Sequence, residues 1–172
     1  GGTDPLTDYA MANSGTAIID IQPRGGLWLR YASLNAGGGN ITLNGSNGSL
    51  VQSTRGLYAT ETTIQTSGSG TITLNGDGGS STGATNPWGI NTGATTIQTD
   101  SGDIHIYGIS NRTNAGNERG MALGGFIQSA SGDIYIEDRT TSATQSNYSA
   151  RFNGIYMPVS IGKGTLASSS SN

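Results

Sequence analysis

One short unit recurs along the chain at an almost constant interval, and this repeat restricts the fold more than any other feature of the sequence. The unit reads GNITLNG, GTITLNG, GDIHIYG and GDIYIED, beginning at residues 39, 70, 102 and 132. Its first isoleucines lie 31, 32 and 30 residues apart, at Ile41, Ile72, Ile104 and Ile134. A fixed period of this length is typical of solenoid proteins, in which each repeat forms one structural layer.

Two further elements follow the unit in the same order in each repeat. The second element is a glycine before an apolar residue, and it occurs at Gly56-Leu57, Gly89-Ile90, Gly120-Met121 and Gly154-Ile155. The third element reads TTIQT at 62–66 and 95–99, GFIQS at 125–129 and VSIGK at 159–163. A more degenerate copy precedes them over residues 17–36. Three short strand-like elements in fixed order indicate one turn of a three-sided coil.

Apolar and polar residues alternate strictly inside the first unit, as the two-residue period of a strand requires. Ile41 and Leu43 share one face, whereas Asn40 and Thr42 share the other. The sequence therefore predicts an all-β chain folded as a right-handed parallel β-helix, or β-solenoid, of about five coils of 30–34 residues with three short strands per coil. A β-sandwich also has short strands and frequent turns, but it does not explain why strands one period apart share sequence.

The expected domain boundaries follow from the first and last repeats. We expect the β-helix to span residues 15–165. It follows an N-terminal segment at 1–14, which is a candidate inter-subunit contact, and precedes a polar, Ser-rich tail at 166–172. The Asn-Gly pairs at 44–45 and 75–76 are expected to form corners, because both residue types tolerate positive φ.

Variation in length and content is confined to one part of each repeat, which predicts that the variable loops project from one corner of the coil. These variable segments are residues 46–55, 77–88, 109–119 and 139–153. Three aromatic residues lie at or near their ends, namely Trp88, Tyr148 and Phe152. We interpret them first as side chains that fold back over the core, with ligand contact as the alternative. Asn111 and Asn147 carry N-x-S/T sequons in these segments and are candidate glycosylation sites.

Composition excludes several classes of function. Half of the 172 residues are Gly, Ser, Thr or Asn, which favours turns and strands over helices. The net charge is −3 and Lys163 is the single lysine, so no basic stripe for nucleic acid is present. The absence of cysteine and the single histidine argue against a metal site. No apolar run reaches the roughly 20 residues of a membrane span. We therefore expect no metal, no cofactor, no nucleic-acid partner and no transmembrane segment.

Titratable residues converge at one place in the predicted fold. Stacking the first units aligns Asp103 with Asp133 and His105 with Tyr135 on the outer face of two adjacent coils. Paired carboxylates can hold Ca²⁺ or act as an acid/base pair, and a histidine titrates near neutral pH. The patch is therefore the candidate site for the alternative function, a β-helix that binds or cleaves polysaccharides. Those strands contain no Lys or Arg, so a solvated polar face without catalytic residues is the preferred interpretation.

Outward threonines in the preceding coil, Thr71 and Thr73, together with the Thr pairs at 62–63 and 95–96, also suggest an ice-binding array. The array is interrupted in the next coils by His105 and Tyr135, which removes the regular lattice that such a surface needs.

The G-[ND]-I-x-[LI]-x-G units, together with TTIQT and the Gly-rich corners, resemble filamentous-haemagglutinin-like exoproteins and the β-strand-repeat surface proteins of bacteria. The resemblance covers roughly residues 15–165. It implies secretion, an elongated rod and a role in adhesion, matrix or cell–cell contact. The coils here are longer than is common in that family, and no functional residue can be carried over.

Taken together, the repeat and the resemblance predict a structural subunit or segment of an extracellular or cell-surface fibre or adhesin, not an enzyme. Neither terminus offers an obvious cap for the exposed strand edges of the end coils. We therefore expect the partner to be the chain itself, as a head-to-tail homopolymer, or the continuation of a longer repeat chain, with surface glycans as further candidate ligands.

Overall fold

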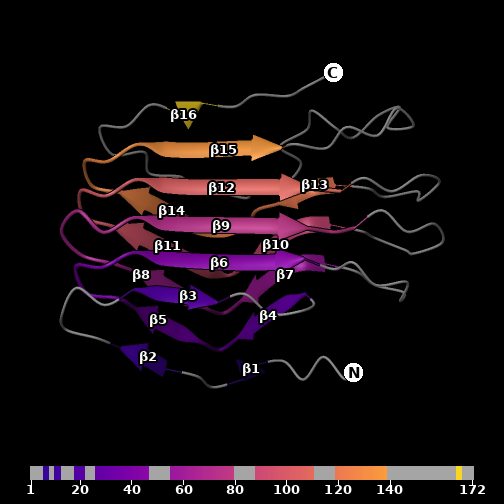
Figure 1. Cartoon of the computed structure of the whole chain (residues 1–172), viewed down its shortest axis with the longest axis horizontal. Helices are drawn as coiled ribbons and strands as arrows, with labels where there is room; N and C mark the ends of the chain where they lie inside the picture. Colours follow the sequence, from indigo (N-terminus) through magenta and orange to yellow (C-terminus); the bar gives the residue numbers. More distant parts are fainter. Residues whose placement is uncertain are drawn as a thin grey trace.

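The chain folds as a parallel β-helix, which confirms the predicted fold class (Figure 1). The computed structural model describes residues 6–7, 10–12, 18–21, 26–46, 55–79, 88–110, 119–138 and 166–167. These residues form strands joined by turns, without a helix in any of the described ranges. The same ranges contain no helix long and apolar enough to cross a membrane.

The strands form three sheets, and five successive coils each contribute one strand to every sheet, while β16 adds a sixth strand to the third sheet. The first sheet comprises β1 (Leu6–Thr7), β4 (Leu27–Arg30), β7 (Arg55–Thr60), β10 (Trp88–Gly93) and β13 (Arg119–Ala122). The second comprises β2 (Ala10–Ala12), β5 (Ser33–Asn35), β8 (Thr63–Gln65), β11 (Thr95–Thr99) and β14 (Gly125–Ser129). The third comprises β3 (Ile19–Ile21), β6 (Ile41–Ser46), β9 (Ile72–Asp77), β12 (Ile104–Ile109), β15 (Ile134–Asp138) and β16 (Leu166–Ala167).

Equivalent residues of successive coils pair in parallel register, as the repeat spacing predicts. In the third sheet Ile72 pairs with Ile41 and with Ile104. Ile104 pairs in turn with Ile134. All four isoleucines are fully buried, and Figure 1 shows their strands stacked one above another. The repeat therefore sets the register of the whole sheet, because one isoleucine fills the same inward position in each coil.

The core is a narrow apolar column enclosed by the three sheets. Each sheet contributes at least one ladder of buried side chains, such as Leu34, Ile64, Ile97 and Ile127 in the second sheet. A neighbouring inward position holds hydroxyl groups instead, at Thr66, Thr99 and Ser129. The Thr66 hydroxyl donates to the Gly39 carbonyl oxygen at 2.7 Å. The Thr99 hydroxyl donates to the Gly102 carbonyl oxygen at 2.6 Å. These bonds satisfy buried carbonyls at the turn between the second and third sheets.

Single residues with left-handed backbone make the corner between the first and second sheets. Tyr31, Glu61 and Ala94 occupy equivalent positions in three coils, with φ of 53°, 49° and 44°. A non-glycine residue seldom adopts this conformation. The surrounding strands hold it in place here, since Glu61 N–H donates to the Gly93 carbonyl oxygen of the next coil at 3.1 Å.

Glycines are required where the third sheet meets the first. A Cβ atom at Gly76 would contact the Gly89 carbonyl oxygen and the Ile90 side chain more closely than real atoms approach. The same conflict would arise between the glycine pairs Gly45/Gly56 and Gly108/Gly120. The two backbones therefore approach each other here at a separation that only glycine permits.

The predicted role of the Asn-Gly pairs was wrong. Residues 44–45 and 75–76 lie inside β6 and β9, and the described glycines with positive φ are Gly37, Gly68, Gly79 and Gly125. Gly45 and Gly76 are needed because they lack a side chain, not because they adopt positive φ.

The first three variable segments connect strands of the third sheet to strands of the first, at one corner as predicted, whereas residues 139–153 lie outside the described residues. Strand pairing also extends beyond the expected span of residues 15–165. β1 and β2 pair with β4 and β5, and β16 pairs with β15. Several predicted features lie outside the described residues, namely Asn111, Asn147, Tyr148, Phe152, Gly154-Ile155 and the VSIGK copy.

Candidate functional site

Asp103 and Asp133 lie next to each other on the outer face of the third sheet, as the alignment of coils predicts. The Asp133 backbone N–H donates to Asp103 Oδ1 at 2.8 Å. The corresponding bond two coils earlier runs from Thr71 N–H to Asn40 Oδ1 at 2.9 Å. Asp103 therefore takes the place of an asparagine amide that links one coil to the next, which is a structural use of one carboxylate oxygen.

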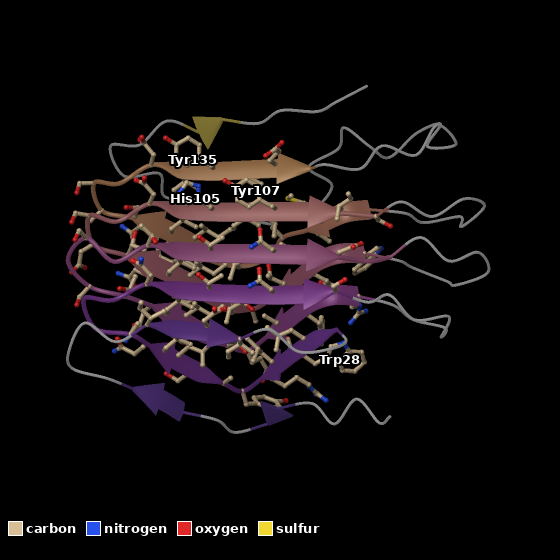
Figure 2. All side chains as sticks on the ribbon, viewed as in Figure 1. Trp28, His105, Tyr107 and Tyr135 are labelled. Atoms are coloured by element: carbon tan, nitrogen blue, oxygen red, sulfur yellow. The ribbon has the colours of Figure 1, made fainter. Side chains whose placement is uncertain are left out.

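The rings of His105 and Tyr135 stack on each other, also as the alignment predicts. Their centroids are 4.9 Å apart and their planes differ by 4°. Figure 2 shows His105, Tyr107 and Tyr135 on the same outer face of β12 and β15. One face of the His105 ring is therefore turned toward a neighbouring coil and not toward solvent.

Sequence reasoning missed Tyr107 as a member of this patch. Its hydroxyl lies 3.1 Å from His105 Nδ1, and the two ring centroids are 6.0 Å apart. Tyr107 is two residues beyond His105 on the same strand, so the alternation rule already assigns both to one face. That rule, applied along the strand as well as between coils, would have found it.

Tyr135 is tied to the acidic pair. Its hydroxyl donates to Asp133 Oδ2 at 3.0 Å. This hydrogen bond and the negative charge of Asp133 raise the pKa of the Tyr135 phenol above its ordinary value, and the charge of Asp103 adds to the effect. At neutral pH the phenol therefore remains a protonated donor to the carboxylate.

The patch brings the four predicted residues together but offers limited chemistry. One oxygen of each aspartate already accepts a hydrogen bond within the patch. In the described part of the chain no three His, Cys, Asp or Glu side chains are arranged to hold a metal ion. A shallow groove beside Tyr107 is lined by Asn44, Asn75 and Asp77, where Asn75 Nδ2 donates to Asn44 Oδ1 at 2.7 Å. The arrangement is that of a polar, hydrogen-bonded surface.

A second cluster lies on the outer face of the first sheet and includes Trp88, the predicted loop-end aromatic. The guanidinium carbon of Arg55 lies 4.3 Å from the centroid of the Tyr58 ring and 5.2 Å from that of the Trp88 ring. Trp28, labelled in Figure 2, packs edge-on against Tyr58 with 5.7 Å between centroids. Trp88 is half-buried beside Arg55 and is not part of the buried core. We call these four residues the Arg55 cluster.

Comparisons of the chain with protein-family models, with curated proteins and with solved structures found no match.

Proposed function

We propose that the chain is a structural subunit or segment of an extracellular or cell-surface fibre or adhesin, in which the β-helix continues end to end from one copy to the next. The observation that carries the proposal is the strand order of the sheets. The first and second sheets end in the strands β1 and β2 at one end and in β13 and β14 at the other, among the strands that the structure describes. An edge of a parallel sheet presents backbone N–H and C=O groups that template another strand.

The direction of the backbone hydrogen bonds supports head-to-tail addition. In the second sheet Thr63 N–H donates to the Ala32 carbonyl oxygen of the preceding coil at 2.8 Å. Alternate residues of a parallel strand bond to the same neighbour, so Gln65 bonds toward the same side as Thr63. Ala12 is in register with Asn35, which is in register with Gln65. The Ala12 amide is therefore directed away from β5 and toward the end of the stack.

A matched pair of substitutions at this edge tests the proposal. The amides of Ala10 and Ala12 both point off this edge, because these residues are in register with Thr63 and Gln65. Ala12→Pro removes one of the two N–H groups and places a proline ring at the contact, and edge strands tolerate proline at such a position. Ala12→Val keeps the N–H. We expect end-to-end fibres from the unsubstituted chain and from Ala12→Val, but no such fibres from Ala12→Pro, in analytical ultracentrifugation and electron microscopy.

Because the opposite end of the Ala12→Pro protein is intact, it should still add to the growing end of an unsubstituted fibre and block it. A small proportion of Ala12→Pro should therefore shorten the fibres far more than the same proportion of Ala12→Val. Equal fibre lengths in the two mixtures would contradict end-to-end addition through this edge.

Polysaccharide binding or cleavage is the second candidate function, and the convergence of Asp103, Asp133, His105 and Tyr135 is the observation that favours it. The engaged oxygens of both aspartates and the lack of Lys or Arg in these strands support a protein without enzymatic activity. Incubation with acidic and neutral polysaccharides, with and without Ca²⁺, should release no products. Cleavage that disappears in the Asp103→Asn, Asp133→Asn double variant would make this second function the better one.

A further inference from the structure

Charge is divided among the three sheets. The first sheet contains Arg30, Arg55 and Arg119 and no acidic residue in its described strands. The described strands of the second sheet contain no charged residue. The third sheet and the residues directly before its strands contain no Lys or Arg, but carry the outward carboxylates Asp20, Asp77, Asp103, Asp133 and Glu137. Counted over the described strands alone, the first sheet is therefore basic, the second is uncharged and the third is acidic, and the exposed Asp100 lies directly after β11 of the second sheet.

Arg55 is positioned to bind a carboxylate. The rings of Tyr58 and Trp88 hold its guanidinium group on the outer face of the first sheet. Its Nε atom is buried and has no hydrogen-bond acceptor among the described residues. A buried donor without an acceptor is unfavourable. Because Arg55 as a whole is only half-buried, a carboxylate can approach the accessible part of its guanidinium group, and this charge-assisted contact would offset the cost of the unpaired Nε.

Two properties favour a second copy of the chain as the source of that carboxylate. Each copy carries both a basic and an acidic face, so complementary faces are present at equal concentration. Both faces also belong to the same stack of coils, with strands about 4.8 Å apart, so successive charges on two parallel rods can meet at a common spacing. Arginine, tryptophan and tyrosine, the residues of the Arg55 cluster, are also the types enriched at the centres of protein interfaces.

We propose that the chains associate side by side, with the Arg55 cluster of one copy on the acidic outer face of the third sheet of a neighbouring copy. The contact joins two different faces, so it repeats without closing and produces bundles of rods. It is distinct from end-to-end stacking, because it uses side chains on the faces of the rod and not the edges of its sheets.

The test compares two substitutions with the same effect on net charge. Arg55→Gln and Gln98→Glu each make the chain one unit more negative, but Gln98 is exposed on the neutral second sheet. Lateral association is measured by sedimentation of the Ala12→Pro protein, in which stacking through the Ala12 edge is blocked, and by electron microscopy of the chain without that substitution. Circular dichroism checks that each variant is folded.

At about 0.01 M salt, where the Debye length is about 30 Å, we expect side-by-side association of the Ala12→Pro protein and of its Gln98→Glu variant. At about 1 M salt, where the Debye length is about 3 Å, the associated copies should separate. Arg55→Gln should weaken this association about tenfold or more, by loss of a charge-assisted contact. Mixing Arg55→Glu with Glu137→Arg should restore association that Arg55→Glu alone lacks.

Association that is equally strong in Arg55→Gln, or that is unchanged by salt, would overturn the proposal. An Ala12→Pro protein that stays monomeric at low salt would also overturn the proposal. The same conclusion would hold if Arg55 instead mediated binding to polygalacturonate, an acidic polysaccharide used as a probe. Fibres that form without bundling would refute only the lateral contact, whereas salt-sensitive lateral association without fibres would refute only end-to-end stacking.

Discussion

Replacing Ile104 with alanine tests whether neighbouring coils bury one another's side chains. Ile104 is fully buried and pairs with Ile72 and Ile134 in the coils on either side. The three carbon atoms that separate isoleucine from alanine are worth about 2.4 kcal/mol of lost burial, at roughly 0.8 kcal/mol each. A residual cavity of about 60 Å³ adds roughly 1.5 kcal/mol if the coils do not collapse into it. We therefore expect the free energy of unfolding to fall by about 4 kcal/mol.

Urea unfolding followed by circular dichroism measures the loss, and Thr73→Ala is the matched control. Thr73 is half-buried on the outer face of the adjacent strand β9 and pairs with His105, so its truncation should cost less than about 0.5 kcal/mol. Amide hydrogen exchange should show the Ile104→Ala protein opening first in β9, β12 and β15, because each coil is stabilised by its nearest neighbours. Equal costs for the two substitutions would refute the stacked ladder.

Three further predictions concern the corner and the polar patch. Gly76→Ala should lower the urea midpoint far more than Gly68→Ala, because a Cβ atom at Gly76 meets backbone and side-chain atoms. A Cβ atom at Gly68 meets open space, and only the positive φ of 58° opposes the alanine, at a cost of about 1 kcal/mol. Asp103→Asn should leave stability nearly unchanged because the amide oxygen can accept the same backbone bond, whereas Asp103→Ala should cost about 1 kcal/mol in the same assay. The pKa of Tyr135 is raised in the folded state, so the stability that the phenol contributes is present below its ordinary pKa of 10.0 and is lost as the pH rises above that value. The free energy of unfolding, measured from neutral to alkaline pH, should therefore show this loss in the unsubstituted chain but not in Tyr135→Phe.

The register of the fold was predictable because one residue type returns at one inward position. The interval between Ile41, Ile72 and Ile104 already specifies which strands lie side by side, and the Asp103/Asp133 and His105/Tyr135 neighbours follow from it. The strands at Leu6–Thr7 and Leu166–Ala167 were not found, because each is two residues long and carries no copy of the repeat.

Features that depend on the cross-section of the coil were harder to predict. The glycine at 76 looks like a turn residue in sequence, and only the convergence of the third and first sheets reveals that its missing side chain is what matters. The contact between Arg55 and Trp88 was missed because they follow loops of unequal length. Each directly precedes the glycine of the second repeat element, as Arg119 does, and aligning the repeats on that glycine would have revealed the pair.

The axial repeat of assembled material tests the central claim of end-to-end stacking most directly. Among the described strands, each copy contributes five to the first sheet, five to the second and six to the third. Helical reconstruction from electron micrographs should therefore show strands about 4.8 Å apart along the fibre and a subunit repeat of five to six strands, roughly 24–29 Å. Density should run without a gap from the last coil of one copy to the first coil of the next. A monodisperse 17.5 kDa monomer that persists at high concentration, or fibres whose strands do not stack along the fibre axis, would contradict the claim.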